Sequence, residues 1–353
     1  MRLIDRYIGR GVVVATLMVM FVLLTLIAFI ELERELEEVG RGTYTIGRVF
    51  LYVGLVLPRF AYEVFPVTAL LGSLIGLGAM ANNSELIAMR AAGVSVGRIA
   101  WAAMKAGLLL MLVAALVGEL LAPASEQLAQ RMRAEAISGQ ITLKTKYGFW
   151  TRDGESFINI RSVLPGAELG DVYIYEFDGK QRLKLASHAE HARYQGDHWL
   201  LENIRQNEFT ADGVRTRTLD RATWESLLDP ALMDMVMMEP NVLPVWGLHR
   251  YITFLHENGQ QASEYEVAFW GKIVTPLVVL VMLVLAIPFV FGSLRTASIG
   301  QRVFAGALVG VGFLVVNKAF AHMAVVYELN PLFAATFPGI ACLGVALLAL
   351  RRV

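Results

Sequence analysis

The sequence has few charged side chains, no net charge and a single cysteine, and each shortage narrows the class of protein. Cys342 cannot form an intrachain disulfide, and its apolar surroundings predict a buried small hydrophobic residue. Because 31 basic residues balance 31 acidic ones, the net charge gives no reason to expect a nucleic-acid partner. With 18% charged and 56% hydrophobic residues, the chain of 353 residues is too apolar for an ordinary soluble enzyme and too charged to lie entirely in a membrane.

Motifs for nucleotide hydrolysis, nucleophilic catalysis and metal binding are also lacking. The sequence contains no G-x-x-x-x-G-K-[ST] pattern, so energy from ATP would have to come from a partner. Gly93, Ser95 and Gly97 match the G-x-S-x-G pattern of serine hydrolases, but that motif joins a strand to a helix, and here both neighbours are apolar runs. Ser95 is instead expected to cap a helix. His188 and His191 would point to opposite faces of a strand. We therefore expect no catalytic residue, metal site or cofactor.

Long apolar runs are abundant by contrast. A transmembrane helix needs about 20 mainly apolar residues, and the first run, residues 11–30, has no charged side chain. ELERELEE follows it directly without a cleavage site, so this run is expected to stay as a membrane span. Gly72 with Gly76, and Gly306 with Gly310, have the spacing that lets helices pack closely. Six spans are predicted, at residues 11–30, 60–80, 101–121, 273–291, 303–325 and 331–350.

Arginines in the short loops predict the orientation, because Lys and Arg are enriched on the cytoplasmic side of a membrane. They precede the first span, follow the second and the fourth, and end the chain, whereas the other side holds the Glu-rich ELERELEEVGRG and the VYELNP loop. Both termini are therefore expected in the cytoplasm, and the stretch between the third and fourth spans outside it. The arginines concerned are Arg2, Arg6, Arg10, Arg90, Arg98, Arg295, Arg302, Arg351 and Arg352.

Residues 123–268 have the composition of a soluble domain inserted between two groups of spans. PASEQLAQRMRAEAISG predicts a helix that leaves the membrane. Short strands separated by turn sequences follow, without helices between them, which is typical of an antiparallel sandwich or jelly roll. The fold class is an α-helical membrane protein of six transmembrane helices with an inserted all-β, jelly-roll-like domain. The predicted strands are 157–163, 171–178, 182–195, 198–210 and 214–228.

One predicted strand carries apolar side chains on both faces. In DVYIYEF, Val172 and Ile174 face one side, and Tyr173 and Tyr175 face the other. A strand buried inside a two-layer sandwich explains this pattern, and so does an open fold whose inner groove holds lipid acyl chains. The sequence leaves both interpretations open.

Four ionisable residues are predicted near the outer membrane surface. Counting about 30 Å of helix from the inner end of the second span places Arg59 near that surface, with Glu63 one turn inside it. The same count along the fifth span places Lys318 at that level and His322 one turn further out. These side chains either snorkel to water, with an Arg59–Glu63 pair along the helix, or bind an anionic lipid headgroup.

The stretch ANNSELIAMRAAGVSVGRIA, residues 81–100, predicts a short helix on the cytoplasmic side. Asn83 or Ser84 can cap its start, and Gly93 can end it in the left-handed conformation. A helix this short is marginal alone, and its apolar residues would be exposed unless a partner covers them. Either a cytoplasmic partner docks here or the helix lies in the lipid interface. The apolar residues are Leu86, Ile87 and Met89.

Over its full length the chain resembles the LptF/LptG permease family, the paired membrane subunits of the bacterial lipopolysaccharide-export ABC transporter. The resemblance implies an inner-membrane subunit, not an enzyme, that pairs with an LptF-type permease above two LptB-type ATPase subunits. It also implies a periplasmic jelly roll that continues through an LptC-type bridge protein, and lipopolysaccharide that is drawn from the outer leaflet. The segments that carry it are LIDRYIG (3–9), LLGSLIGLGAMANNSELIAMRAAG (70–93), GELLAPASEQLAQRMRAEA (118–136), GLHRYITFL (247–255) and FGSLRTASIGQRV (291–303).

Within that scheme residues 83–93 are the coupling helix, and Glu85 matches the acidic residue seated in a groove of the ATPase. We assign this role to Glu85, Leu86, Met89 and Arg90, and we assign lipopolysaccharide binding to Arg34, Arg41, Arg59, Lys318 and His322. The domains are then residues 1–122 with spans one to three, 123–268 with the β domain, and 269–353 with spans four to six.

Three alternatives to this assignment remain. The sister permease LptF is the nearest one. A membrane-bound lipid-modifying enzyme would need a cluster of acid, base or metal-binding side chains on the outer side, and the sequence shows none. A passive scaffold would need neither the exposed short helix nor charges at the depth of the outer leaflet.

Overall fold

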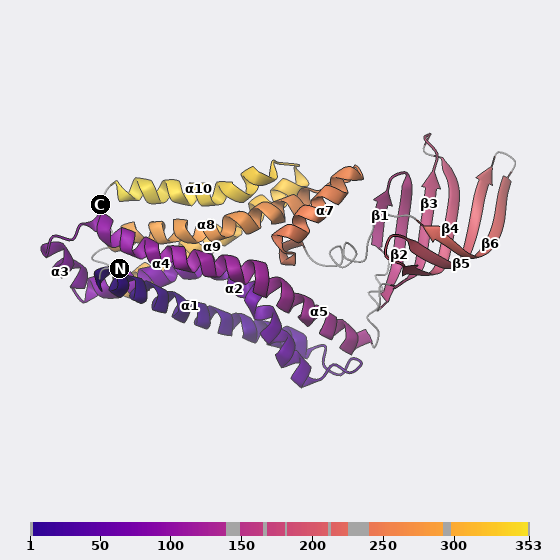
Figure 1. The fold of residues 1–353 in the computed structure, drawn as a ribbon. Helices are drawn as coiled ribbons and strands as arrows, with labels where there is room; N and C mark the ends of the chain where they lie inside the picture. The colour runs from indigo at the N-terminus through magenta and orange to yellow at the C-terminus, as the bar shows by residue number, and fades with distance from the viewer. Residues whose placement is uncertain are drawn as a thin grey trace.

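A computed structural model describes residues 3–138, 149–164, 168–180, 182–210, 213–224, 240–291 and 298–351. The molecule is elongated, with long helices side by side over one part and a β-sheet at the far end (Figure 1). Both labelled chain ends lie at the end of the helical part remote from the sheet, next to the short helix α3 (Glu85–Ala91). The predicted short helix and the predicted inserted domain therefore occupy opposite ends of the molecule.

Within the described residues, six helices are long and apolar enough to cross a membrane, which confirms the predicted six spans. Several of these helices are longer than the predicted spans. The fourth begins ten residues early, at Ser263, and the second has 37 residues, a length of about 55 Å against about 30 Å of hydrocarbon. They are α1 (Leu3–Leu36), α2 (Ile46–Asn82), α4 (Val96–Leu116) with its continuation described next, α8 (Ser263–Phe291), α9 (Ile299–Val326) and α10 (Pro331–Leu350).

The third span and the predicted helix that leaves the membrane form one continuous rod. The α4 helix passes through a π-helical turn, η1 (Val117–Leu121), into α5 (Ala122–Ser138) without a break. At its start Ser95 accepts a hydrogen bond from the backbone N–H of Arg98 at 3.3 Å, so the predicted cap is confirmed. Single π turns are rare inside α-helices and often lie at functional positions.

Close contacts at glycine place α2 at the centre of the bundle. Of its most apolar window 78% is buried, against 17% for α1 and for α9. A Cβ atom on Gly76 would lie 2.8 Å from the carbonyl oxygen of Gly11 in α1, and one on Gly310 of α9 would lie 2.7 Å from the Val67 side chain. Any larger residue would push these helices apart. The glycine pairs thus serve packing within this chain, as the spacing predicted.

The inserted domain contains one six-stranded antiparallel sheet within the described residues, with its strands in sequence order. The five predicted strands are confirmed, except that positions 225–228 of the last lie outside the described residues. The first strand, β1, was not predicted. The strands are β1 (Phe149–Asp153), β2 (Ser156–Leu164), β3 (Glu168–Phe177), β4 (Leu183–Tyr194), β5 (Trp199–Thr210) and β6 (Gly213–Trp224).

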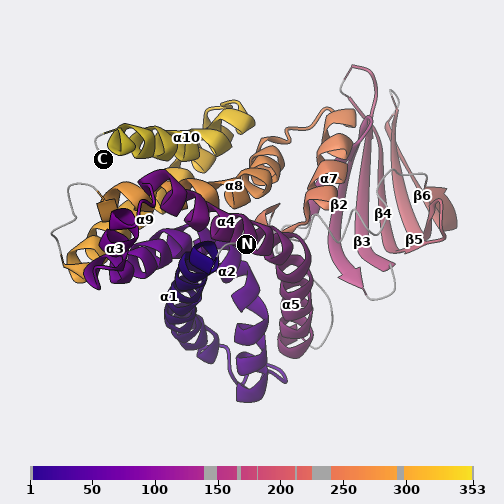
Figure 2. The ribbon, with the colours of Figure 1, turned by 60° about the vertical axis from the view of Figure 1, so that its left-hand side comes forward.

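The two faces of the sheet differ in what covers them. Val172 and Ile174 are buried in one apolar cluster with residues of α7 (Val245–Glu257), and Figure 2 shows α7 beside β2. On the other face Tyr175 stacks on Trp150 at 5.8 Å between ring centroids, and Tyr173 stacks on His188 at 4.4 Å. Within the described strands, ring stacking therefore accounts for the apolar residues on the second face, without a second sheet.

Two amides at the corner between α7 and α8 tie the sheet to the helices. Asn258 Oδ1 accepts a hydrogen bond from the Gly154 N–H at 3.2 Å, and Gln260 Nε2 donates to the Arg152 carbonyl at 2.9 Å. The Gly154 N–H and the Arg152 carbonyl both belong to the β1–β2 hairpin. The first hairpin is therefore anchored on the connection between α7 and α8.

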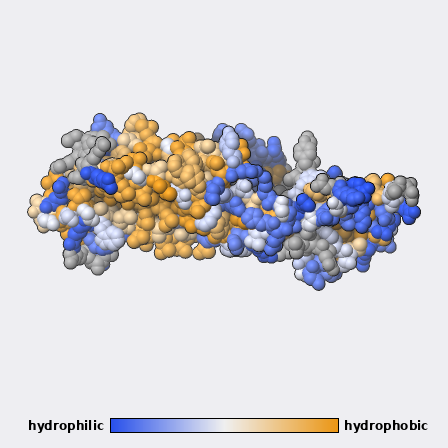
Figure 3. All heavy atoms as spheres, turned by 90° about the horizontal axis from the view of Figure 1, so that it is seen from above, coloured by the Kyte–Doolittle hydropathy of each residue, from blue (hydrophilic) through white to orange (hydrophobic). Residues whose placement is uncertain are grey.

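The surface divides into an apolar and a polar part. In Figure 3 the helical part is covered mainly by hydrophobic residues, and the part that carries the sheet is mainly hydrophilic. Many large apolar side chains on α1, α9 and α10 are exposed, for example Phe21 at 73%, Phe304 at 67% and Leu348 at 64%. Such a surface is stable only when the lipid of a bilayer or another apolar surface covers it.

Candidate functional site

The end of the molecule remote from the sheet presents a carboxylate on a short helix. Glu85 is the first residue of α3 and accepts a hydrogen bond from the Tyr7 hydroxyl of α1 at 2.8 Å. Ile87 is 50% exposed and Arg90 is exposed, so α3 offers a charged and partly apolar surface. This geometry suits recognition by another protein and contains no catalytic arrangement.

Two expectations for this helix were wrong in detail. Leu86 is buried and belongs to the main apolar cluster with Ile8 of α1, and Met89 is partly buried against it, because α3 folds back onto the bundle. Neither Leu86 nor Met89 is fully exposed as predicted. Ser84 occupies the N-cap position, but it adopts the left-handed conformation and its side chain makes no capping hydrogen bond. Gly93 does adopt positive φ, at 85°.

Arg59 of α2 faces two carboxylates. Its Nε lies 3.9 Å from Glu63 Oε1 on the next turn and 3.7 Å from Glu126 Oε2 on α5. Glu126 is 3% exposed, and its other oxygen accepts a hydrogen bond from Gln130 at 2.9 Å. The predicted pair along the helix is present, and a buried interhelical pair that was not predicted accompanies it.

The two arginines after the first span are paired locally. Arg34 bonds Glu31 at 3.0 Å and Arg41 bonds Glu38 at 2.6 Å, and both guanidinium groups remain largely exposed, at 69% and 64%. Pairs this exposed contribute little to stability. Arg34 and Arg41 are therefore accessible from outside, with part of their charge offset by a neighbouring carboxylate.

A buried ion pair at the same end was missed by sequence reasoning. Glu35 is 7% exposed, and its Oε2 accepts hydrogen bonds from Arg133 Nε of α5 and from the Tyr44 hydroxyl, both at 2.9 Å. Burial and the hydrogen bond to Glu35 raise the pKa of Tyr44 above its usual value, so its hydroxyl remains a donor. The polar residues Glu126, Gln130 and Arg133 lie at helical spacing, which is the signal that could have revealed this polar face of α5.

Lys318 and His322 lie one turn apart on an exposed face of α9. Neither has an ion pair with the part of the chain that the structure describes. The five predicted lipid-binding residues belong to α1, α2, α9 and the loop after α1.

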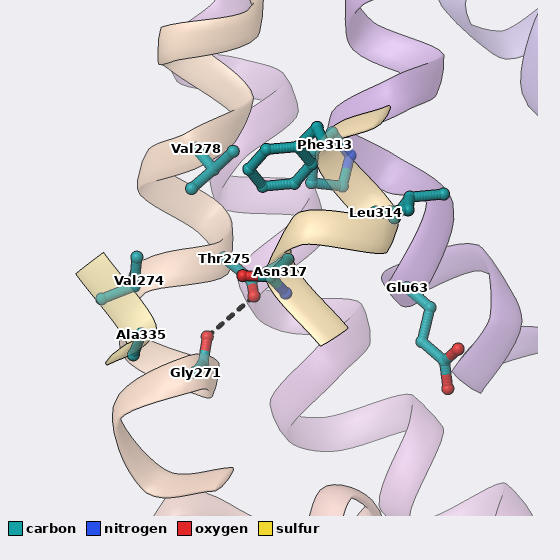
Figure 4. Close-up of a pocket in the computed structure, with 10 residues that line it drawn as sticks. Glu63, Gly271, Val274, Thr275, Val278, Phe313, Leu314, Asn317 and Ala335 are labelled. Carbon is teal, nitrogen blue, oxygen red and sulfur yellow. Dashed lines mark hydrogen bonds between the residues drawn. The ribbon is translucent and has the colours of Figure 1, made fainter. Parts of the chain in front are cut away.

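A small cavity opens between α2, α8, α9 and α10 on the level of Glu63 (Figure 4). Its polar lining consists of Glu63, Thr275 and Asn317, and the Thr275 hydroxyl donates to the Gly271 carbonyl at 2.7 Å. The volume of about 50 Å³ admits a few water molecules and no lipid. This cavity is therefore not itself a lipid site.

A second polar cluster surrounds the π turn. Lys272 of α8 is 9% exposed and donates to the Gly118 carbonyl at 3.0 Å, and Tyr62 of α2 packs on Gly118 and donates to the Lys272 carbonyl at 3.1 Å. The Glu119 carboxylate accepts from the Val245 N–H at the start of α7, at 2.8 and 3.0 Å. The cluster joins α2, α4, α7 and α8 where the helical part meets the polar part.

The remaining sequence patterns have structural roles where the structure describes them. His188 lies 3.2 Å from Asp171, and His191 lies 3.2 Å from Glu168. Among the described residues, no group of three or more His, Cys, Asp or Glu side chains is arranged to hold a metal ion. Arg2, Arg295 and Arg352, which entered the orientation argument, lie outside the described residues.

Six helices long and apolar enough to cross a membrane, with a polar domain inserted after the third, define a multi-pass membrane protein. The family model for the lipopolysaccharide export system permease LptF/LptG matches residues 6–352, and the chain belongs to this family. It is therefore a permease subunit for lipopolysaccharide export, a transport component of the inner membrane.

Curated relatives agree with this membership. The chain is 39% identical over 342 residues to the lipopolysaccharide export system permease protein LptG of Haemophilus influenzae, covering 96% of this chain and 95% of that protein. It is 34% identical over 352 residues to LptG of Escherichia coli strain K12, covering 99% and 98%. The match to LptF of that strain is 28% over 180 residues, about half of each chain. Similarity to LptG is thus more extensive than similarity to LptF, and the two names imply an export system with a sister permease.

Proposed function

We propose that this permease draws lipopolysaccharide from the outer leaflet of the inner membrane and passes it to a periplasmic bridge. In this proposal α3 and both termini face the cytoplasm, and the β domain faces the periplasm. The support is the gathering of short-loop arginines at the α3 end of the bundle, as the positive-inside rule requires of a cytoplasmic face. The described ones are Arg6, Arg10, Arg90, Arg98, Arg302 and Arg351.

The α3 helix is the proposed coupling helix for two LptB-type ATPase subunits. The observation that carries this proposal is the partly exposed Glu85 carboxylate, held on a two-turn helix at the far end from the sheet. The chain has no P-loop of its own, so hydrolysis has to be supplied from outside it. Glu85 with the exposed Arg90 forms the polar part of the surface, and Met89 contributes its exposed part. Leu86 supports the helix from beneath.

The sister subunit is proposed to be an LptF-type permease, and the sparsely buried helices α1 and α9 leave apolar surface for it. We further propose three domains, at residues 1–122, 123–268 and 269–353. An LptC-type bridge protein would continue from the β domain. Within the described strands β6 pairs only with β5, so its outer edge can accept a further strand.

Lipopolysaccharide is proposed to contact the cations of the outer end. Lys318, His322, Arg34 and Arg41 are exposed there, and phosphate groups form strong hydrogen bonds with such donors. Arg59 is less accessible, with 23% of its side chain exposed. It would contribute by exchanging a carboxylate partner for a phosphate.

Charge reversal at Glu85 tests the coupling role. Glu85→Lys should insert and pair with the sister permease, but should bind the ATPase roughly tenfold or more weakly, because like charges across an interface cost several kcal/mol. Glu85→Gln removes the charge at nearly constant size and should have a smaller effect. The measurements are the affinity of purified heterodimer for the ATPase and the ATP-dependent release of lipopolysaccharide.

Glu257→Lys is the matched control, since Glu257 is an exposed residue on a helix at the opposite end. It should behave like the unmodified protein in both assays. If Glu85→Lys also retains full ATPase affinity and full lipid release, the coupling role of Glu85 is wrong.

A further inference from the structure

The hydrogen bond between Tyr7 and Glu85 links two elements that are 78 residues apart in sequence. Tyr7 is on the first turns of α1, and Glu85 begins α3. This bond is the polar contact that the structure shows for the Glu85 carboxylate, and the proposed coupling function rests on that carboxylate. A carboxylate accepts several hydrogen bonds, so the contact to Tyr7 orients Glu85 and leaves acceptor positions for another protein.

The first turns of α1 are fixed in place on both sides of Tyr7. Asp5 is 6% exposed and its carboxylate receives a hydrogen bond from Lys105 of α4 at 2.6 Å. Ile8 is fully buried in the apolar cluster that also contains Leu86 of α3. With these anchors, the Tyr7 hydroxyl has a defined position relative to α3.

The side chains around this bond are accessible and partly apolar. Leu3 is 83% exposed, Tyr7 51% and Ile87 50%. Leu3 and Tyr7 are four residues apart, so they lie on one face of α1. The Tyr7–Glu85 hydrogen bond joins this face of α1 to α3, so exposed side chains of two helices meet at an acceptor.

We propose that Tyr7 is a positioning residue of the ATPase-docking surface, and that the first turn of α1 and α3 receive the nucleotide-hydrolysing partner as one unit. The inference rests on the proposed coupling role of Glu85 and extends it to a second helix. A partner that meets this surface needs a donor or cation for Glu85 and apolar side chains for Leu3, Tyr7 and Ile87.

This composite surface gives the ATPase a direct connection to α1. Besides the packing of α1 on α2, the bond to Glu85 and the ion pair to Lys105 are specific links at the inner end of α1. At its outer end Glu35 is bonded to Arg133 of α5. A displacement of α3 by the ATPase would therefore move α1 with it.

A double-mutant cycle on the assembled heterodimer tests the inference. Tyr7→Phe removes only the hydroxyl and should raise the dissociation constant of the ATPase roughly threefold to tenfold, the change that corresponds to the net contribution of one ordinary hydrogen bond. It should also raise the number of ATP molecules hydrolysed per lipopolysaccharide released. Tyr7→Phe combined with Glu85→Ala should bind no more weakly than Glu85→Ala alone, because Glu85→Ala already removes the acceptor that the Tyr7 hydroxyl positions.

Tyr327→Phe is the matched control, because Tyr327 is 69% exposed at the other end of the bundle. It should leave both quantities unchanged. The inference is overturned if Tyr7→Phe binds like the unmodified protein, or if its effect multiplies with that of Glu85→Ala. A cycle in which Glu85→Ala and Glu85→Lys are themselves without effect instead rejects the coupling role of Glu85, and the role of Tyr7 with it.

Discussion

Arg59 of α2 lies 3.7 Å from the buried Glu126 carboxylate of α5, so a candidate lipid-binding cation is also half of an interhelical ion pair. The same guanidinium lies over the ring of Phe60 at 4.7 Å, which further restricts it. Loss of function after a change at Arg59 has therefore two explanations, a missing contact to lipid and a weakened contact between helices. A compensating change at Glu126 separates them.

Arg59→Gln is expected to destabilise the heterodimer by about 1–3 kcal/mol, because the Glu126 carboxylate loses a nearby cation. This is less than the roughly 3–5 kcal/mol for a fully buried pair, since Arg59 is partly exposed. Arg59→Gln with Glu126→Gln should recover most of the stability. If Arg59 binds lipid, both variants should retain less lipopolysaccharide. Thermal stability and bound lipid are measured on the same preparations, and full lipid retention by the stable double variant would remove Arg59 from the lipid site.

Lys272→Met is expected to lower thermal stability by about 1–3 kcal/mol, because it leaves the Gly118 carbonyl in the π turn without its donor. Methionine keeps most of the volume, so the effect reports the polar contact. The matched control is Lys180→Met, at an exposed turn of the sheet, which should stay within about 0.5 kcal/mol. If both variants have the same melting temperature, the stability of the π turn does not depend on Lys272.

The proposed orientation predicts opposite labelling at the two ends of the molecule. In a Cys342→Ala background, Lys180→Cys in the sheet should react with a membrane-impermeant thiol reagent added to intact spheroplasts. Asn83→Cys, which precedes α3, should react only after permeabilisation. Both positions are exposed, so access to the side chain is not limiting. The reverse pattern would place α3 outside the cytoplasm.

Local patterns in the sequence were sufficient for the spans and for most strands. Apolar runs gave the six long helices, alternation with turn sequences gave β2 to β6, and the glycine spacing gave the packing of α2 on α1 and α9. Each of these signals is contained in fewer than about 25 consecutive residues. The short strand β1 lacks such a signal, since it has only five residues.

Contacts between distant segments could not be predicted in the same way. The pairs Glu35–Arg133 and Tyr7–Glu85 join residues 98 and 78 positions apart, and no periodicity reports them. The burial of Leu86 depends on how α3 folds back onto α1, which the composition of α3 does not encode by itself. For the same reason the predicted lipid-binding cations were identified by depth and charge, while their carboxylate partners were not.

The continuous rod of α4, η1 and α5 makes the position of the far end of α5 sensitive to small changes in the angle at the π turn. The α5 part has 17 residues, an arm of about 26 Å beyond the π turn. A tilt of about 5° at the turn displaces the far end of that arm by about 2 Å. Arg133 lies near that end and donates a hydrogen bond to Glu35, whereas Lys272 and Tyr62 make their hydrogen bonds at the π turn. Angular changes too small to repack the bundle are thus enough to break or form a hydrogen bond at the far end of α5.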